Sequence, residues 1–140
     1  MQRIMAFDVG ERRIGVAVSD PLGITAQGLE TYTRSGELGQ DVSHILELAG
    51  AYAPVKLLFG MPRNMNGSYG MQAEVTQTFA DAVLAKWDGE FDYADERLTT
   101  MAAKRVLLEA DVRRDKRKQV IDKLAAVIIL QGYMDAHPNG

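Results

Sequence analysis

The sequence predicts an α/β fold in which helices pack on the faces of a mixed β-sheet. Two patterns support this prediction: the chain opens with three strands in succession, and it then alternates helices with short apolar strands. Successive strands favour antiparallel pairing, whereas the later alternation is typical of parallel βαβ connections. With 140 residues, 46% of them hydrophobic, the chain is expected to form one domain (1–140) around a single core.

Three short strands are expected near the start of the chain, over residues 3–9, 14–19 and 24–33. Each is rich in apolar or β-branched residues and is bounded by glycine, proline or charged residues, which are typical of turns. Only residues 10–12 connect the first two strands, so we expect these two to form an antiparallel hairpin.

Helices and strands alternate over the remainder of the chain. Residues 37–52 carry apolar side chains at the three- and four-residue spacing of an amphipathic helix. Residues 61–70 are rich in glycine, proline and asparagine and are expected to form a loop, as is the basic segment 113–118. We expect helices over 37–52, 72–87, about 100–110 and 118–136, and strands over 55–60 and 91–96.

Composition excludes several classes of protein. The chain has no cysteine, so disulfide frameworks and thiolate zinc sites are ruled out. The longest apolar run, Leu124 to Leu130, is far shorter than the roughly 20 residues that cross a bilayer. The first residues lack the pattern of a signal peptide. We therefore expect a cytoplasmic protein with no membrane partner.

The net charge of −3 conceals an uneven distribution. Residues 1–96 carry 7 basic and 14 acidic side chains, whereas residues 97–140 carry 9 basic and 5 acidic ones. The basic residues are densest in "RRDKRK". Such a cluster either contacts phosphates or forms a solvated loop. The same two interpretations apply to Arg12 and Arg13 in the first hairpin. These basic residues are Arg12, Arg13, Arg113, Arg114, Lys116, Arg117 and Lys118.

Three carboxylates stand where functional groups gather in α/β proteins. Asp8 lies at the end of the first strand, and Glu96 ends the last one. Functional side chains collect at the carboxyl ends of strands in such sheets, so these two meet if their strands are neighbours. Asp122 lies in the final helix, on a face that also carries Ala125 and Ala126. That face is expected to pack on the sheet and to bring a third carboxylate to the same place.

A cluster of three carboxylates predicts a metal site, because the charges repel one another unless a cation neutralises them. Mg²⁺ takes oxygen ligands, keeps several waters and is shared with substrate phosphates. Two such ions can activate a water and stabilise the leaving oxygen of a phosphodiester. The group therefore points to a metal-dependent nuclease.

Each of the three carboxylates also has a purely structural explanation. Asp8 could cap a turn or simply be exposed at the end of its strand. Glu96 could pair with Arg97 or Arg13. Asp122 could be a first-turn helix residue that the helix dipole favours.

Four segments of the chain resemble, in order and spacing, the YqgF (RuvX) family. They are "FDVGERRIGVAVSD", "GMPRNMNGSYGMQAE", "DERLTTMAAKRVLLEA" and "KRKQVIDKLAAVIILQGYMD", and together they cover nearly the whole chain. The resemblance implies a ribonuclease H-like fold with a five-stranded sheet of strand order 3-2-1-4-5. It also implies a nuclease that processes the 5′ end of the 16S ribosomal RNA precursor; the family was earlier considered to consist of Holliday junction resolvases.

The acidic site of the family falls, by position, on Asp8, Glu96 and Asp122. The loop departs from the family pattern, because Arg63 stands where an apolar residue is usual and Asn66 where an aspartate is usual. Arg63 adds a candidate phosphate contact. The similar resolvases commonly carry a second acid three residues along the last helix, whereas this chain has Ala125 there, which weakens the prediction of a resolvase.

The leading hypothesis is a Mg²⁺- or Mn²⁺-dependent nuclease that acts on structured RNA. The alternatives are a Holliday junction resolvase-like DNA nuclease and a non-catalytic nucleic-acid-binding factor in ribosome assembly. We expect the partners to be precursor ribosomal RNA or branched DNA and a ribosomal precursor particle, and the chain to be a monomer or weak homodimer. The expected phosphate contacts are Arg12, Arg13, Arg63, Arg113, Arg114, Arg117 and Lys118.

Overall fold

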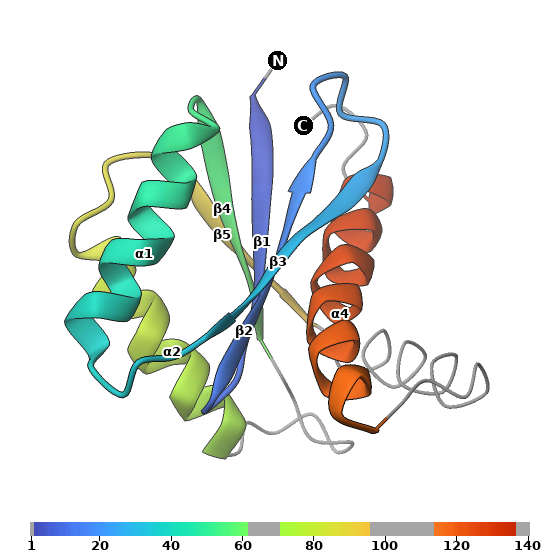
Figure 1. Ribbon diagram of the computed structural model, residues 1–140. Coiled ribbons are helices and arrows are strands. Elements are labelled where there is room, and N and C mark those ends of the chain that lie inside the picture. The colour runs from blue at the N-terminus through green and yellow to red at the C-terminus, as the bar shows by residue number, and fades with distance from the viewer. Residues whose placement is uncertain (1, 62–70, 96–113, 137–140) are drawn as a thin grey trace.

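The computed structural model describes residues 2–61, 71–95 and 114–136, with the backbone alone for residues 71–72, 95 and 114–122. Five strands form one sheet in the order β3-β2-β1-β4-β5, and helices cover both of its faces (Figure 1). This order confirms the five-stranded mixed sheet expected from the sequence. The elements are β1 (Arg3–Val9), β2 (Arg13–Ser19), β3 (Ala26–Thr33), α1 (Leu38–Ala51), β4 (Val55–Met61), α2 (Met71–Leu84), β5 (Phe91–Asp95) and α4 (Arg114–Ala136).

The central strand β1 lies between one antiparallel and one parallel neighbour. It pairs antiparallel with β2, with Asp8 opposite Gly15, and parallel with β4. Strand β4 in turn pairs parallel with β5. The carboxyl ends of β1, β4 and β5 therefore lie at the same edge of the sheet. Strands β1 and β5 are not direct neighbours, because β4 lies between them.

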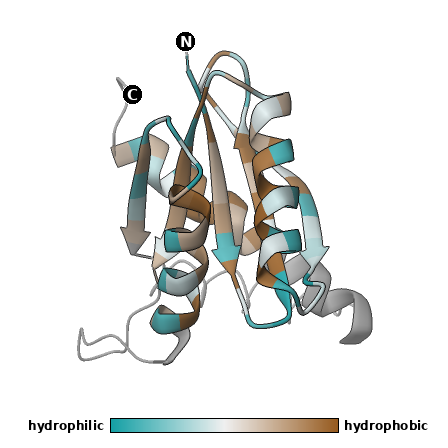
Figure 2. Cartoon of the chain, turned by 90° about the vertical axis from the view of Figure 1, so that its left-hand side faces the viewer, coloured by the Kyte–Doolittle hydropathy of each residue, from teal (hydrophilic) through white to brown (hydrophobic). Residues whose placement is uncertain are grey.

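Strand alternation divides the core into two layers. Met5, Phe7 and Val9 of β1 are buried against α1 and α2. Ile4 and Ala6 point to the opposite face, where they pack against α4. Figure 2 shows hydrophobic colour concentrated in the middle of the sheet, hydrophilic colour at strand ends, and mixed colours along the helices, as expected when each helix turns one face to the sheet.

Hydrogen bonds fix α4 to the sheet at the end opposite the carboxyl ends of β1, β4 and β5. The Tyr133 hydroxyl accepts a hydrogen bond from Lys56 Nζ (2.7 Å) and donates one to Asp92 Oδ2 (2.8 Å). The hydrogen bond to Tyr133 raises the pKa of Lys56, and burial raises the pKa of Tyr133. Gln131 Oε1 accepts a hydrogen bond from the backbone N–H of Ala26 (3.0 Å). These contacts join α4 to three strands and set its register on the sheet.

Several element boundaries differ from the sequence prediction. Strand β2 begins one residue earlier, at Arg13, and β3 begins only at Ala26. The reason for the late start of β3 is that Asp20 Oδ1 accepts hydrogen bonds from the N–H groups of Ile24 (2.7 Å) and Thr25 (3.3 Å) and keeps them in the turn. Helix α2 ends at Leu84, three residues earlier than expected.

The basic segment expected as a loop is largely helical. Helix α4 begins at Arg114, so the prediction that the final helix starts at Lys118 was wrong. Arginine, lysine and glutamine are good helix formers, and the sequence has no proline or glycine between positions 114 and 131 to stop the helix. Arg113, the loop over 62–70 and the helix predicted over about 100–110 lie outside the described residues. Within the described residues, no helix is long and apolar enough to cross a membrane.

Candidate active site

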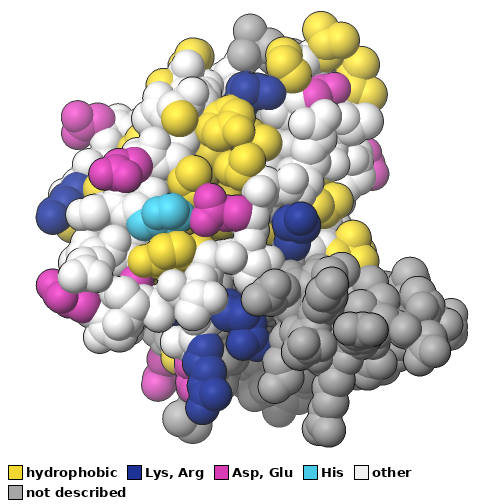
Figure 3. Space-filling model, in the orientation of Figure 1, with side chains coloured by type: hydrophobic (Ala, Val, Ile, Leu, Met, Phe, Trp, Pro, Cys, Tyr) yellow, Lys and Arg dark blue, Asp and Glu magenta, His cyan; other side chains and the backbone are white. Residues whose placement is uncertain are grey.

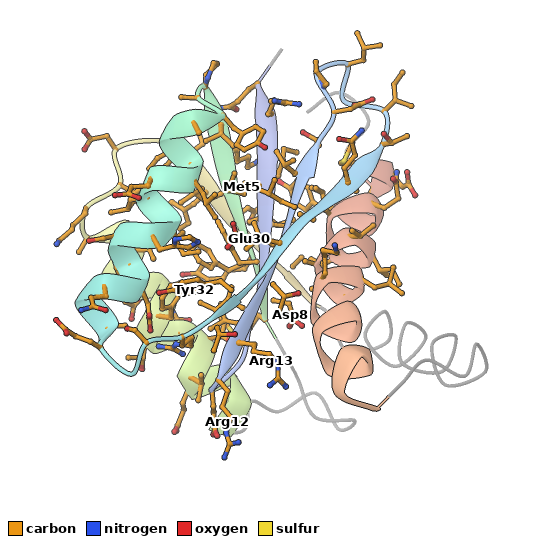
Figure 4. All side chains as sticks on the ribbon, in the orientation of Figure 1. Met5, Asp8, Arg12, Arg13, Glu30 and Tyr32 are labelled. Carbon is orange, nitrogen blue, oxygen red and sulfur yellow. The ribbon has the colours of Figure 1, made fainter. Side chains whose placement is uncertain are left out.

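Asp8 lies on the α4 face of the sheet, one residue before the end of β1 (Figure 4). Every second side chain of a strand points to the same face, so Asp8 shares a face with Ile4 and Ala6, which both belong to the core layer under α4. Its side chain is half-buried. Simple exposure at the end of the strand therefore does not explain this carboxylate, because withdrawing a charge from water costs free energy.

The neighbours of Asp8 across the sheet are glycines. Gly15 of β2 is directly opposite. On the other side Ala6 pairs with Leu58, and continuing this parallel register places Gly60 beside Asp8. Because neither glycine has a side chain, no side chain of β2 or β4 stands directly beside the Asp8 carboxylate at these two positions. This arrangement suits an oxygen donor that binds a cation or holds a water.

The turn after Asp8 depends on a close backbone contact. The N–H of Gly10 donates to the carbonyl oxygen of Arg13 (2.8 Å). A β-carbon at position 10 would lie 2.8 Å from the same oxygen, which is backbone and has no freedom to move aside. Glycine is therefore required at this turn, which joins the strand of Asp8 to the strand of Arg13.

Arg34 holds this hairpin from the side of α1. Its Nη1 donates to the carbonyl oxygen of Gly10 (3.0 Å), and its backbone N–H donates to the carbonyl oxygen of Arg12 (2.8 Å). Its Nε donates to Oδ2 of Asp41 in α1 (3.1 Å). The Arg34 side chain is 15% exposed. One side chain thus connects the helix to the turn that follows Asp8.

Asp41 is the anchor of this connection. Its side chain is 1% exposed, and it accepts hydrogen bonds from the Tyr32 hydroxyl (2.8 Å) and from the N–H and hydroxyl of Ser35 (both 2.9 Å), besides Arg34. Burial by itself raises the pKa of Asp41, but the hydrogen bonds from Ser35, Tyr32 and Arg34 outweigh burial and lower this pKa. The carboxylate is therefore charged and fully partnered.

Sequence reasoning missed this pair of positioning residues. A signal was present, because Asp41 lies one turn after Leu38 and one turn before Ile45, on the apolar stripe of α1. An acid on such a stripe needs a buried partner. The identity of that partner was not available from the sequence, since no spacing rule connects Asp41 to Arg34.

The two arginines of the hairpin differ in environment. Arg12 is exposed at the end of the turn, whereas Arg13 is half-buried at the start of β2. Arg13 is two residues before Gly15, which pairs with Asp8, so the side chains of Arg13 and Asp8 are on the same face of the sheet. Both residues are labelled in Figure 4.

Glu96 lies outside the described residues, directly after β5 ends at Asp95. On β5, Asp92 contacts Tyr133 of α4, and Ala94 packs against the core layer under α4.

Asp122 is part of α4, with its backbone described and its side chain not. Position 122 lies one helical turn before Ala126, which is fully buried against the sheet. It also lies more than two turns after the start of α4 at Arg114. The explanation of Asp122 as a first-turn residue is therefore wrong.

The convergence of the three carboxylates stays a prediction. The described side chains contain no group of three histidine, cysteine, aspartate or glutamate residues that could hold a metal ion, but Glu96 and the Asp122 side chain are not among them. Arg63 and Arg113 also lie outside the described residues. The backbone positions of Arg114, Arg117 and Lys118 belong to the first turns of α4.

Comparison with solved structures shows a related fold. The chain matches the structure described as "T. thermophilus RuvC in complex with Holliday junction substrate", with a TM-score of 0.58 and 15% sequence identity. The match covers 98% of this chain and 96% of that one. This likeness confirms the ribonuclease H-like fold expected from the sequence.

Comparison with other sequences identifies the family. A protein of Heliobacterium modesticaldum named "Putative pre-16S rRNA nuclease" is 54% identical over 134 residues, which cover 96% of this chain and 89% of the relative. A protein of the same name from Clostridium tetani is 47% identical over 137 residues, with 98% and 99% covered. The family model described as "RuvX: Holliday junction resolvase" matches residues 2–136. The chain therefore belongs to the RuvX family.

Proposed function

We propose that this chain is a metal-dependent nuclease that hydrolyses phosphodiester bonds in structured RNA. Its substrate is the precursor of 16S ribosomal RNA, trimmed at the 5′ end in the cytoplasm within a ribosomal precursor particle. The observation that carries this proposal is the half-buried Asp8 at the carboxyl edge of the sheet, flanked by glycines and facing α4. The names of the relatives support the choice of RNA as substrate.

Asp8, Glu96 and Asp122 form the catalytic group of this proposal. Two features of the backbone support it: position 96 follows two β5 residues on the α4 face, and position 122 is one turn from a buried alanine. Position 122 lies in the first half of α4, toward the end of the sheet that carries Asp8, because α4 runs antiparallel to β1 (Figure 1). We expect the three carboxylates to lie within about 10 Å of one another, the reach of two ions roughly 4 Å apart with their ligands.

The donor set suits Mg²⁺ or Mn²⁺. Carboxylate oxygens are the ligands that these hard cations prefer, and glycines, which add no side chain, are the partners of Asp8 on the neighbouring strands. Asp8, Glu96 and Asp122 would hold the metal. When bound, a pair of such ions supplies an activated water and stabilises the leaving oxygen of a phosphodiester.

The basic residues near this group bind the phosphates of the substrate. In α4, positions 114, 118, 122 and 126 follow one another at four-residue spacing and therefore share a stripe of the helix. A strand of phosphates held by Arg114 and Lys118 would be led toward Asp122. The full set that we propose is Arg12, Arg13, Arg63, Arg113, Arg114, Arg117 and Lys118.

A resolvase-like DNA nuclease is the second candidate, favoured by the description of the family model and by the fold shared with RuvC. Against it, position 125 is a fully buried alanine, so α4 offers no carboxylate three residues after Asp122. A non-catalytic assembly factor would bind nucleic acid without cleaving it.

One incubation separates the three candidates. The purified chain is mixed with a 16S precursor fragment that retains its 5′ extension, or with a four-way DNA junction, in the presence of Mg²⁺ or Mn²⁺. We expect shortening of the RNA at its 5′ extension and an intact junction. Cleavage of the junction alone would support the resolvase, and binding without cleavage of either would support the assembly factor.

Metal binding should stabilise the folded chain. At a free Mn²⁺ or Mg²⁺ concentration ten times the dissociation constant, binding adds about 1.4 kcal/mol to the free energy of unfolding. For a chain of this length, that raises the melting temperature by about 3–6 °C. Thermal unfolding with and without metal measures the shift, with Ca²⁺-free EDTA buffer as the reference. A wild-type melting temperature that does not respond to millimolar metal would contradict the proposed site.

A further inference from the structure

Lys123 of α4 lies across the edge strand β3. A β-carbon built at Gly28 would be 2.9 Å from Lys123 Cγ, 3.0 Å from Cδ and 3.3 Å from Cε. The aliphatic part of the lysine therefore rests on the bare backbone of Gly28, in space that any other residue at this position would occupy. The contact brings together residues of β3 and α4, which pack against each other on one face of the sheet.

The ammonium group of Lys123 has no hydrogen-bond or ion-pair partner within the described part of the chain, and the residue is exposed. Lys56, by contrast, lies on the same face of the sheet but is engaged by Tyr133. In Figure 3, Lys and Arg side chains lie between the middle of the face formed by β3 and its lower edge. This lower edge is the end of the sheet toward which β1 runs in Figure 1. A cation with no internal partner on such a face is available to an external anion.

The sheet register gives the position of Lys123 relative to Asp8. Gly28 pairs with Ala17, Ala17 pairs with Ala6, and Asp8 follows Ala6 by two residues on the same face. With strands about 4.8 Å apart and a rise of about 3.3 Å per residue, the Cα atoms of Gly28 and Asp8 are roughly 12 Å apart. The aliphatic chain of Lys123 therefore lies two strands away from Asp8, on the same face of the sheet, a position that suits a neighbouring phosphate of the same nucleic acid strand.

We propose that Lys123 binds a backbone phosphate of the nucleic acid strand that enters the site of Asp8, and that Gly28 is the residue that allows it to do so. The inference rests on the proposed nuclease function and adds a positioning residue to it. An ammonium group contacts phosphate as a point charge, so it holds the strand in place without reading its sequence. Lys123 thereby fixes the strand on the β3 side of Asp8.

The test measures binding of a short single-stranded RNA of mixed sequence in EDTA, so that cleavage plays no part in the readout. We expect Lys123→Met to weaken binding by roughly two- to fivefold, the value of an exposed ion pair. The log–log dependence of affinity on salt should flatten by about 0.7, the contribution of one phosphate contact on a single strand. Methionine keeps an aliphatic chain over Gly28, so the variant removes the charge without uncovering the sheet. Lys123→Arg should bind like the wild type, as should Lys86→Met, an exposed lysine beyond the end of α2.

Gly28→Ala provides an independent check through the side chain of Lys123. The added methyl group displaces the flexible lysine chain, so binding should weaken in the wild-type background but not further in Lys123→Met.

Equal affinity and equal salt slope for wild type and Lys123→Met, or additive effects of the two substitutions, would overturn the inference. So would a wild-type chain that binds no RNA. Failure of the nuclease proposal is seen separately, as absence of metal-dependent cleavage by a chain that still binds RNA through Lys123.

Discussion

Replacing Asp8 by asparagine is expected to lower metal-dependent cleavage of the RNA precursor by at least about a thousandfold. Asparagine has the same size as aspartate but no negative charge, so it removes the attraction for a divalent cation and leaves the packing of β1 in place. Asp8 is half-buried, and the residues beside it on β2 and β4 are glycines. Neither of these two partners has a side chain that could replace Asp8 as a ligand. The rate is measured on the labelled precursor under single-turnover conditions.

The control for this experiment is Asp88→Asn. Asp88 is an exposed aspartate in the turn between α2 and β5, far along the chain from the β1–β2 hairpin. We expect full activity from this variant. Asp8→Asn should also lose the rise in melting temperature that Mg²⁺ or Mn²⁺ gives the wild type, while unfolding in EDTA at nearly the wild-type temperature. An Asp8→Asn chain that keeps a tenth or more of the wild-type rate would exclude Asp8 from the metal site.

Asp41→Asn is expected to lower the free energy of unfolding by about 3 kcal/mol, because it leaves the Arg34 guanidinium without its buried counter-charge. The amide would also replace an oxygen that accepts hydrogen bonds with a group that donates them, next to donors from Tyr32 and Ser35. For a chain of this length the melting temperature should fall by roughly 10 °C. Urea unfolding at neutral pH measures the loss, with Asp88→Asn expected within about 0.5 kcal/mol of wild type.

The pH dependence of the same variant gives a second measurement. The pKa of Asp41 in the folded chain is lowered from its ordinary value of 3.8, so its ionised form stabilises the fold. This contribution is fully present above pH 3.8 and is lost as the pH falls through the lowered pKa of the folded state. The difference in stability between wild type and Asp41→Asn should therefore be largest at neutral pH and shrink in acid below pH 3.8. A difference that stays constant down to pH 2 would show that the charge of Asp41 does not stabilise the fold.

Much of the fold could be predicted from the sequence because its signals are local. The three opening strands and the helix over residues 37–52 follow from the spacing of apolar residues within a few positions of one another, and the structure places them within two residues of the expected bounds. Helix α4 shows the limit of such signals. Its basic first turns resemble a solvated loop in charge, but they have the backbone preferences of a helix and continue the one that follows.

The candidate site was predictable only in part. Asp8 could be identified because a carboxylate among the apolar residues of a strand is costly and therefore needs a reason. Its face of the sheet follows from strand alternation, but the choice of α4 as the helix over that face required the folded chain. Glu96 and Asp122 stay predictions, supported by the direction of β5 and by the distance of position 122 from the start of α4.

The sequence by itself determined the elements, their alternation and the carboxylate at the end of the first strand, since each depends on side chains close together in the chain. Tertiary structure alone decided that Arg34 connects Asp41 to the carbonyl of Gly10, and that Lys123 rests on Gly28. Those contacts join residues from different elements, and many partners of the same chemistry are available along the chain. Which of them meet depends on strand order and helix register, because hydrogen bonds and packing contacts act only over a few ångströms once the core has fixed the distances between elements.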